Sequence, residues 1–166
     1  MNLLLLRHAR AERPDPAVYP DDDLRPLTEA GVKRHRRVSK VFHAMGIRPD
    51  RIITSPRLRA RQTAEITAAV LGLEERLVQN VVLGAEYSLH AVLEMLAICD
   101  PKEMVMLVGH EPDLGVLAGQ LLGPNAGPTV RFRKGALLGL SFPGIPQPGS
   151  GVLAFFYRPD DLLALS

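Results

Sequence analysis

The stretch from Asn2 to Arg10, NLLLLRHAR, decides the fold that we predict for this chain of 166 residues. Its four consecutive leucines form a short apolar run, which is typical of a buried strand in a parallel sheet. The run ends at Arg7 and His8. Because ligands of open α/β sheets bind beyond the carboxyl ends of the strands, we expect both side chains to face a binding crevice.

Strands and helices alternate along the rest of the chain. A proline-rich loop over residues 9–27, which we interpret as a flap beside the first strand end, separates the first strand from the first helix. Apolar spacing and turn residues then predict a helix capped by Thr28, with Val38, Val41, Phe42 and Met45 inward, and ending at Gly46; a strand over 51–55; a helix opened by Ser55 and Pro56 and closed by Gly72; a strand over 77–83; a helix over 88–98; a strand over 104–108; a helix over 114–122 capped by Asp113; and strands over 129–133, 136–142 and 152–157. This alternation predicts one domain over residues 1–166, a three-layer α/β/α sandwich with a mostly parallel, mixed sheet.

Composition excludes several classes of protein. Hydrophobic residues make up 46% of the chain and charged residues 23%, close to the average for soluble globular proteins. The formal charge of +2 is too small to suggest a nucleic-acid partner. No apolar run is long enough for a membrane span and no secretory signal opens the chain, so we expect no membrane partner and a cytoplasmic location. Cys99 is the single cysteine and is interpreted as a packing residue.

Two histidines occupy equivalent places in the predicted sheet. His8 and His110 each follow an apolar strand at its expected carboxyl end. If the two strands are neighbours, both imidazoles open into one crevice. A metal site would be the competing use of two histidines, but it needs a third ligand, and the chain has neither an HExxH motif nor a Cys/His cluster. We therefore expect no metal and no cofactor.

Arginines accompany these histidines. Sixteen of the twenty basic residues are arginine, whose planar fork of donors fits phosphate oxygens. In the segment SPRLRARQTA, residues 55–64, Arg57 and Arg61 are four apart and share a helix face, whereas Arg59 lies on another side. Imidazoles and arginines that converge near a helix N-terminus, without a cysteine or serine nucleophile, indicate phosphoryl transfer to histidine.

Four ordered segments resemble the motifs of the histidine phosphatase superfamily, which includes the phosphoglycerate mutases: RHA at 7–9, LTEAG at 27–31, SPRLRA at 55–60 with Thr63 and Ala64, and GH at 109–110. The resemblance covers residues 3 to about 122, and RPLTEAG, SPRLRARQTA and GHEPDLG are most similar to the SixA-type phosphohistidine phosphatases. It implies a phosphoglycerate mutase-like fold, His8 as the nucleophile that becomes phosphorylated, Arg7 and Arg59 as phosphate ligands, and His110 as the second histidine facing the phosphoryl group. Ala9 departs from the family pattern, which has glycine there.

Whether the site can cleave a phosphate ester or is better suited to phosphohistidine depends on whether a general acid is present. Many relatives that cleave phosphate esters use a carboxylic acid between the second and third motifs, and SixA-type proteins have no obvious equivalent. Glu86 in GAEYS is the one candidate here, with a surface carboxylate at a helix start as the competing interpretation. The flap aspartates at 21–23 and Arg25 are further residues that could reach the site. General-acid catalysis is commonly worth about 10² to 10⁴ in rate, and imidazole leaves more readily than an alkoxide.

The sequence thus predicts a phosphatase with a covalent phosphohistidine intermediate that acts on phosphohistidine carried by a protein. A phosphomonoesterase acting on a small phosphorylated metabolite is the alternative, favoured if Glu86 faces the crevice. A third possible function is a non-catalytic phosphate-binding module. The presence of a nucleophilic histidine speaks against it, because a protein that only binds phosphate needs no nucleophile. A mutase is less expected, since no insertion is suited to shield a phosphoenzyme from water.

Overall fold

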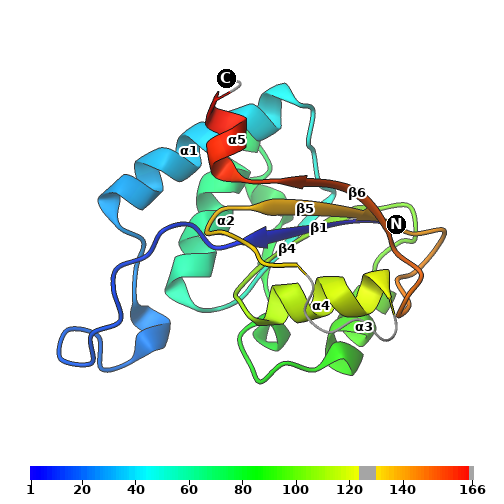
Figure 1. The fold of residues 1–166 in the computed structure, drawn as a ribbon, viewed down its shortest axis with the longest axis horizontal. Helices are drawn as coiled ribbons and strands as arrows, with labels where there is room; N and C mark the ends of the chain where they lie inside the picture. Colours follow the sequence, from blue (N-terminus) through cyan, green and yellow to red (C-terminus); the bar gives the residue numbers. More distant parts are fainter. Residues whose placement is uncertain (124–129, 165–166) are drawn as a thin grey trace.

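The computed structural model describes residues 1–123 and 130–164, and in these ranges the chain is built on one six-stranded sheet of order β3-β2-β4-β1-β5-β6 (Figure 1). Four strands run parallel: β1 (Asn2–Arg7), β2 (Arg51–Thr54), β3 (Leu77–Gln79) and β4 (Met104–Gly109). The antiparallel hairpin of β5 (Leu137–Ser141) and β6 (Val152–Tyr157) extends the sheet beside β1. The predicted mostly parallel, mixed sheet is confirmed.

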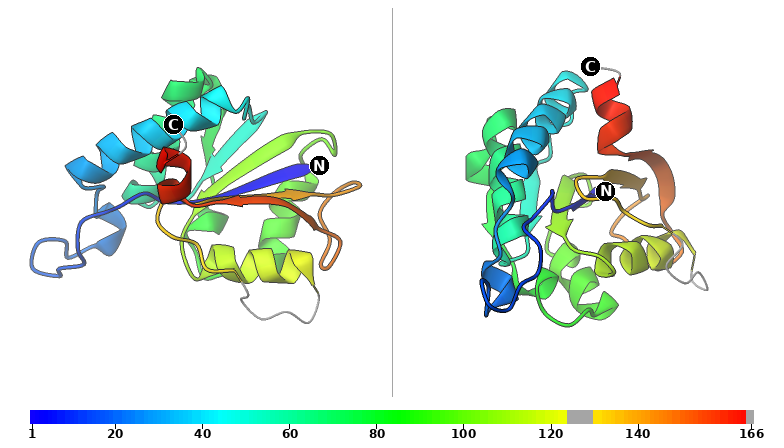
Figure 2. Two further views of the ribbon diagram at one scale, coloured as in Figure 1. Left: turned by 45° about the horizontal axis from the view of Figure 1, so that its top comes forward. Right: turned by 60° about the vertical axis from the view of Figure 1, so that its left-hand side comes forward.

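Helices cover both faces of the sheet, as the views in Figure 1 and Figure 2 show. On one face lie α1 (Glu29–Ala44), α2 (Leu58–Leu71) and the C-terminal α5 (Pro159–Ala164). On the other lie α3 (Leu89–Ala97) and α4 (Asp113–Leu122). This arrangement is the three-layer α/β/α sandwich predicted from the alternation of strands and helices. No helix in the described ranges has the length and hydropathy to cross a bilayer.

The leucines of β1 explain why its sequence is apolar without interruption. Leu3 and Leu5 pack into the core under α3 and α4, whereas Leu4 and Leu6 pack into the core under α1 and α2. None of the four is more than 2% exposed. Since successive side chains of a strand point to opposite faces, a strand covered on both faces has no position for a polar residue.

The register of β1 with β4 brings two chain segments together at one edge. Leu6 pairs with Val108 and Arg7 with Gly109. The backbone N–H of His8 then donates to the carbonyl of Gly109 at 3.0 Å. His8 and His110 therefore both follow the paired ends of neighbouring parallel strands, as the sequence predicts if β1 and β4 are adjacent.

Two predicted strands are wrong in extent or absent. The strand expected over 77–83 ends at Gln79, because the Asn80 side chain accepts from the N–H of Val82 and opens a 3₁₀ turn, η3 (Val81–Leu83). Of the strand expected over 129–133, residues 130–133 are not a strand, and residue 129 lies outside the described residues. Instead of strand pairing, hydrogen bonds of Phe132 with Arg7 and Glu111, at the carboxyl ends of β1 and β4, hold this segment.

Two helix starts and one buried position also differ from the prediction. α2 begins at Leu58 with Arg57 as N-cap, not at Ser55 and Pro56, and the Ser55 hydroxyl accepts from the N–H of Arg57 at 3.3 Å in the bend before the helix. Asp113 is the first residue of α4, and its N-cap is Pro112. Met45 was expected inward, but α1 ends at Ala44 and Met45 is 42% exposed. Thr28 caps α1 as predicted, since its hydroxyl accepts from the N–H of Gly31 at 2.8 Å.

The flap, residues 9–27, is irregular as its prolines predict. It holds one short 3₁₀ turn, η1 (Asp22–Leu24), and is closed at its base by a bridge between Ala11 and Leu27. In Figure 1 it is the dark blue loop that extends beyond the carboxyl end of β1. The flap is therefore placed to cover whatever binds at that edge of the sheet.

Candidate active site

His8 lies at the centre of the crevice and is 6% exposed. Its Nδ1 is 2.8 Å from the carbonyl oxygen of Ala9. A carbonyl can only accept, so Nδ1 carries the proton and Nε2 keeps its lone pair. Burial is the largest cause that lowers the pKa of His8 to about 3, and nearby cations add to it: Arg59, Arg7 and Lys134. His8 is therefore a neutral imidazole with an available nitrogen at neutral pH.

His110 faces His8 across the crevice. The two ring centroids are 5.2 Å apart and the rings are inclined by 50°. His110 Nε2 lies 2.8 Å from the Ser55 hydroxyl, and within the described residues its buried Nδ1 has no hydrogen-bond partner. Burial first, and then the proximity of His8 and Arg59, lower the pKa of His110 to about 2. The predicted meeting of the two imidazoles is confirmed.

Arg7 is held against the segment after α4. Its Nη1 donates to the carbonyl oxygen of Phe132 at 2.6 Å, and the N–H of Phe132 in turn donates to Glu111 Oε1 at 2.5 Å. Burial lowers the pKa of Arg7, while the charge of Glu111 opposes that shift. Glu111 was missed in the sequence, although its position directly after His110 in GHEPDLG marks it as a carboxylate at the same strand end.

Of the three arginines, Arg59 and Arg61 lie in α2 and point apart, whereas Arg57 is the N-cap before the helix, so the helix face predicted for Arg57 and Arg61 together is not observed. Arg59 is 4% exposed, and its guanidinium donates to the carbonyl of Asp22 at 2.7 Å and pairs with the Asp22 carboxylate at 3.1 Å. Arg57 pairs with Asp23 at 2.9 Å on the rim, and Arg61 pairs with Glu65 on the outer face. Of the three, Arg59 is the one buried in the crevice beside His8.

The two secondary candidates have different surroundings. Arg25 is buried and holds the flap together, since its Nε donates to Asp22 at 2.7 Å and its Nη1 to the carbonyl of Glu12 at 2.7 Å. Glu86 is exposed on the loop after Gly84 and makes no hydrogen bond or ion pair within the described part of the chain. The structure thus brings Arg25 to the Asp22 side of the crevice and leaves Glu86 without contact to either histidine.

Thr63 links the segment of His8 and Ala9 to α2, a role that the sequence did not reveal. Its hydroxyl accepts from the N–H of Ala9 at 3.0 Å and donates to the carbonyl of Arg59 at 2.7 Å. The same residue, Ala9, supplies the carbonyl that fixes the His8 tautomer. Thr63 therefore ties the orientation of His8 to the helix that carries Arg59.

Gly31 accounts for the glycine of the LTEAG segment. A Cβ atom at this position would lie 2.1 Å from the carbonyl oxygen of Arg10, closer than any side chain allows. That carbonyl accepts from the N–H of Thr28 at 3.0 Å. The segment thus fastens the start of α1 to the residues that follow His8, which is a structural role in support of the site.

The donors and charges of the crevice define its chemistry. Arg7 and Arg59 lie close enough to both histidines for their charges to lower the pKa of each imidazole. In the described ranges no group of three or more His, Cys, Asp or Glu residues is arranged to hold a metal ion. Guanidiniums suit the equatorial oxygens of a phosphoryl group, and a neutral imidazole lone pair can attack phosphorus. The class that fold and site indicate is a phosphoryl-transfer protein.

Comparison with known proteins agrees with this class. The model of the histidine phosphatase superfamily (branch 1) matches residues 3–81. An uncharacterised protein of Picosynechococcus is 38% identical over 143 residues, 84% of each chain. Two solved structures share the fold. The protein histidine phosphatase SixA in complex with tungstate has a TM-score of 0.81 at 24% identity and covers 98% of this chain and 99% of its own. A histidine-to-alanine mutant of a phosphoserine phosphatase of Entamoeba histolytica, in complex with phosphoserine, has a TM-score of 0.68 at 15% identity, and the match covers 95% of this chain and 97% of that chain. The chain belongs to the histidine phosphatase superfamily and is a phosphatase.

Proposed function

We propose that this phosphatase works through a phosphohistidine formed on His8. Nε2 of His8 attacks phosphorus, a bond forms between the two atoms, and the bond from phosphorus to the leaving group breaks. Water then attacks the phosphohistidine, releasing inorganic phosphate and restoring the imidazole. The observation that carries the proposal is the hydrogen bond from His8 Nδ1 to Ala9, which leaves Nε2 unprotonated.

The oxygens of the transferring phosphoryl group would be held by Arg7, Arg59 and His110. The Ser55 hydroxyl accepts from the N–H of Arg57 at 3.3 Å, so its own proton is available to His110 Nε2. In that arrangement His110 Nδ1 carries a proton and has no partner within the described residues. A phosphoryl oxygen would supply that missing acceptor, and the guanidiniums would stabilise the charge of the transition state.

Phosphohistidine on a protein is the substrate that the site supports best. The carboxylate nearest to Arg59 is Asp22, and its hydrogen bond to Arg25 lowers the pKa of that carboxyl, which keeps it ionised. An ionised carboxylate cannot protonate a leaving alkoxide, and within the described residues Glu86 makes no hydrogen bond or ion pair to either histidine. Asp113 lines the same pocket as His110, and burial raises its pKa, so it is the carboxyl group that would serve an ester. A leaving imidazole needs less help than an alkoxide, which favours a phosphoramidate.

The test compares a phosphohistidine-bearing carrier protein with a panel of small phosphate esters, using wild type, His8→Ala and the control His43→Ala. His43 is exposed on α1. We expect phosphate release from phosphohistidine by wild type and control, background release by His8→Ala, and acid-labile phosphate trapped on His8 in rapid-quench samples. Activity retained by His8→Ala would exclude the mechanism.

Faster turnover of an ester would assign a small phosphorylated metabolite as substrate, the second candidate. The fold shared with the phosphoserine phosphatase is the observation in its favour. Binding of the phosphorylated carrier without phosphate release or a trapped intermediate would identify a non-catalytic binding module.

A further inference from the structure

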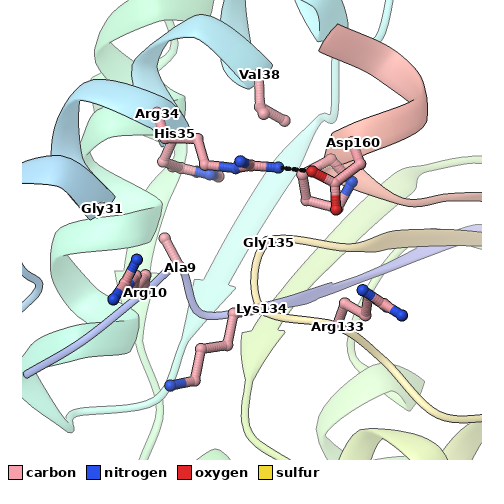
Figure 3. Close-up of a pocket in the computed structure, with 11 residues that line it drawn as sticks. Ala9, Arg10, Gly31, Arg34, His35, Val38, Arg133, Lys134, Gly135 and Asp160 are labelled. Carbon is pink, nitrogen blue, oxygen red and sulfur yellow. Dashed lines mark hydrogen bonds and ion pairs between the residues drawn. The ribbon is translucent and has the colours of Figure 1, made fainter. Parts of the chain in front are cut away.

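A second polar pocket opens next to the nucleophile's segment (Figure 3). It has a volume of about 270 Å³ and lies between the end of β1, the first turns of α1, and the turn that leads into β5. Its lining includes Ala9, Arg10, His35, Arg133, Lys134 and Gly135. Because Ala9 directly follows His8, the pocket adjoins the phosphoryl crevice.

The charge of this pocket is strongly positive. Its lining has four basic residues and one acidic residue, Asp160, which pairs with Arg34. In the described part of the chain Arg10 and Lys134 make no side-chain hydrogen bond or ion pair. His35 donates through Nε2 to Thr67, whose own hydroxyl donates to Thr63, and its buried Nδ1 lacks a partner in the described ranges. Arg10 and Lys134 are both exposed, so their charges are free to pair with an anion that enters the pocket, whereas the Nδ1 lone pair of His35 would not bind one.

Lys134 connects the pocket electrostatically with the crevice. Its charge contributes to the lowered pKa of His8. Burial, and then the proximity of Arg7, Arg25, Arg10 and Arg59, lower the pKa of the Lys134 ammonium. An anion beside Lys134 would relieve the repulsion among these cations.

The position of Lys134 is fixed by the backbone. The N–H of Gly135 lies 3.1 Å from the carbonyls of both Arg7 and His8. Gly135 has φ of +82°, which is in the region that favours glycine. In the view of Figure 3, the side chains of Lys134 and Arg10 extend toward the same side, whereas Arg133 extends away from them. The turn therefore presents the Lys134 charge beside the strand end that carries the nucleophile.

We propose that this pocket is an anion subsite that binds an acidic side chain close to the phosphohistidine of a protein substrate, with Lys134 and Arg10 as its ligands. The inference rests on the proposed function and adds to it a preference among carriers. A protein segment is favoured over a free anion because the pocket adjoins the crevice, so that one chain can present a phosphorylated side chain to His8 and a neighbouring carboxylate to Lys134.

The experiment uses two pairs of synthetic peptides. One pair carries phosphohistidine and the other phosphoserine, and within each pair the residues flanking the phosphorylated position are either glutamate or glutamine. The quantity measured is the ratio of kcat/KM for the glutamate peptide to that for the glutamine peptide. The enzymes are wild type, Lys134→Gln, Arg10→Gln, and Lys102→Gln as a control. Lys102 is an exposed lysine before β4, at the opposite edge of the sheet.

We expect wild type and Lys102→Gln to favour the glutamate peptides by about fivefold or more, the equivalent of one partly desolvated ion pair. Lys134→Gln and Arg10→Gln should each bring the ratio toward one, and 0.5 M salt should do the same in wild type. A ratio near one in wild type would overturn the subsite while leaving phosphohistidine hydrolysis intact. A ratio that persists in both variants would also overturn it.

Failure of the proposed function gives a different pattern. Wild type would then hydrolyse the phosphoserine pair and not the phosphohistidine pair. The subsite is judged in that case from the glutamate preference within the phosphoserine pair. Inhibition by free glutarate that depends on Lys134, without any preference between peptides, would identify a small-anion site and overturn a protein ligand.

Discussion

The orientation of His8 depends on the backbone of one residue, Ala9. Its carbonyl accepts from His8 Nδ1, and its N–H donates to Thr63, which also donates to Arg59. This short chain of hydrogen bonds sets both the tautomer of the nucleophile and its position relative to a guanidinium of the crevice. A small displacement of a reacting group can cost about a hundredfold in rate.

Replacement of Thr63 tests this coupling. Thr63→Val keeps the shape of the side chain but leaves the N–H of Ala9 without an acceptor. We expect kcat to fall about tenfold to a hundredfold, with KM changed much less, and the unfolding free energy to fall by about 1–3 kcal/mol. Thr63→Ser should restore most of kcat. Steady-state kinetics and urea unfolding of both variants provide the measurements. A loss of stability with unchanged kcat would show that Thr63 supports the fold alone.

At the scale of elements, the flap presents a carboxylate to the N-terminal end of α2, where Arg59 lies. Asp22 pairs with Arg59 at 3.1 Å and with Arg25 at 2.7 Å. A phosphoryl group that binds Arg59 meets this carboxylate in the same place. The flap thus holds an internal anion where the substrate's anion is expected, and Arg25 keeps it there through a further bond to the carbonyl of Glu12.

Removal of the Asp22 charge should therefore strengthen anion binding. For Asp22→Asn we expect the inhibition constant of inorganic phosphate to fall about threefold to tenfold, since one repulsive charge is removed from a partly exposed site. Asp15→Asn in the same flap is the control, because Asp15 is bonded within the flap, to the N–H of Ala17. Competitive inhibition assays report the change. A weaker phosphate affinity in Asp22→Asn would mean that the carboxylate serves to order the flap and not to compete.

At the scale of the whole molecule, the three buried histidines link folding to pH. Burial is the first cause that lowers the pKa of His8 to about 3, of His35 to about 4 and of His110 to about 2. An unfolded histidine titrates near about 6.5. Below that pH the unfolded chain binds protons that the folded chain does not, so stability is fully present above about pH 6.5 and is lost as the pH falls toward these values.

The predicted loss of stability at acidic pH can be checked by measuring the free energy of unfolding at several pH values. Between pH 7 and pH 5, where few carboxyl groups titrate, we expect the free energy of unfolding to decrease, with a limit of about 1.4 kcal/mol per pH unit for each buried histidine. His35→Gln should reduce that slope, because it removes one of the three titrating groups. Urea unfolding at half-unit steps gives the slope. A free energy that stays constant or rises on acidification would contradict the burial of neutral imidazoles.

Local patterns of the sequence determined the elements and the chemistry of the strand ends. Leu3 to Leu6 and the run over 104–108 are short apolar runs typical of strands buried on both faces, and each run is followed within two residues by a histidine. Helical periodicity separated Arg59 from Arg57 and Arg61, because side chains two residues apart on a helix point to different sides. Prolines excluded regular structure from most of the flap. These features depend on neighbours in the chain, so the sequence alone specifies them.

Tertiary structure alone decided which groups meet. Glu111, Thr63, Asp22 and Lys134 reach the crevice from four separate segments, and their contacts depend on strand order and on how α2 and the flap pack against β1. The tautomer of His8 follows from one carbonyl, and the Ser55 hydroxyl lies 2.8 Å from His110 Nε2, a contact that its place in the sequence did not reveal. Long-range packing sets distances and desolvation, and these quantities fix hydrogen-bond partners and pKa values, which no local pattern records.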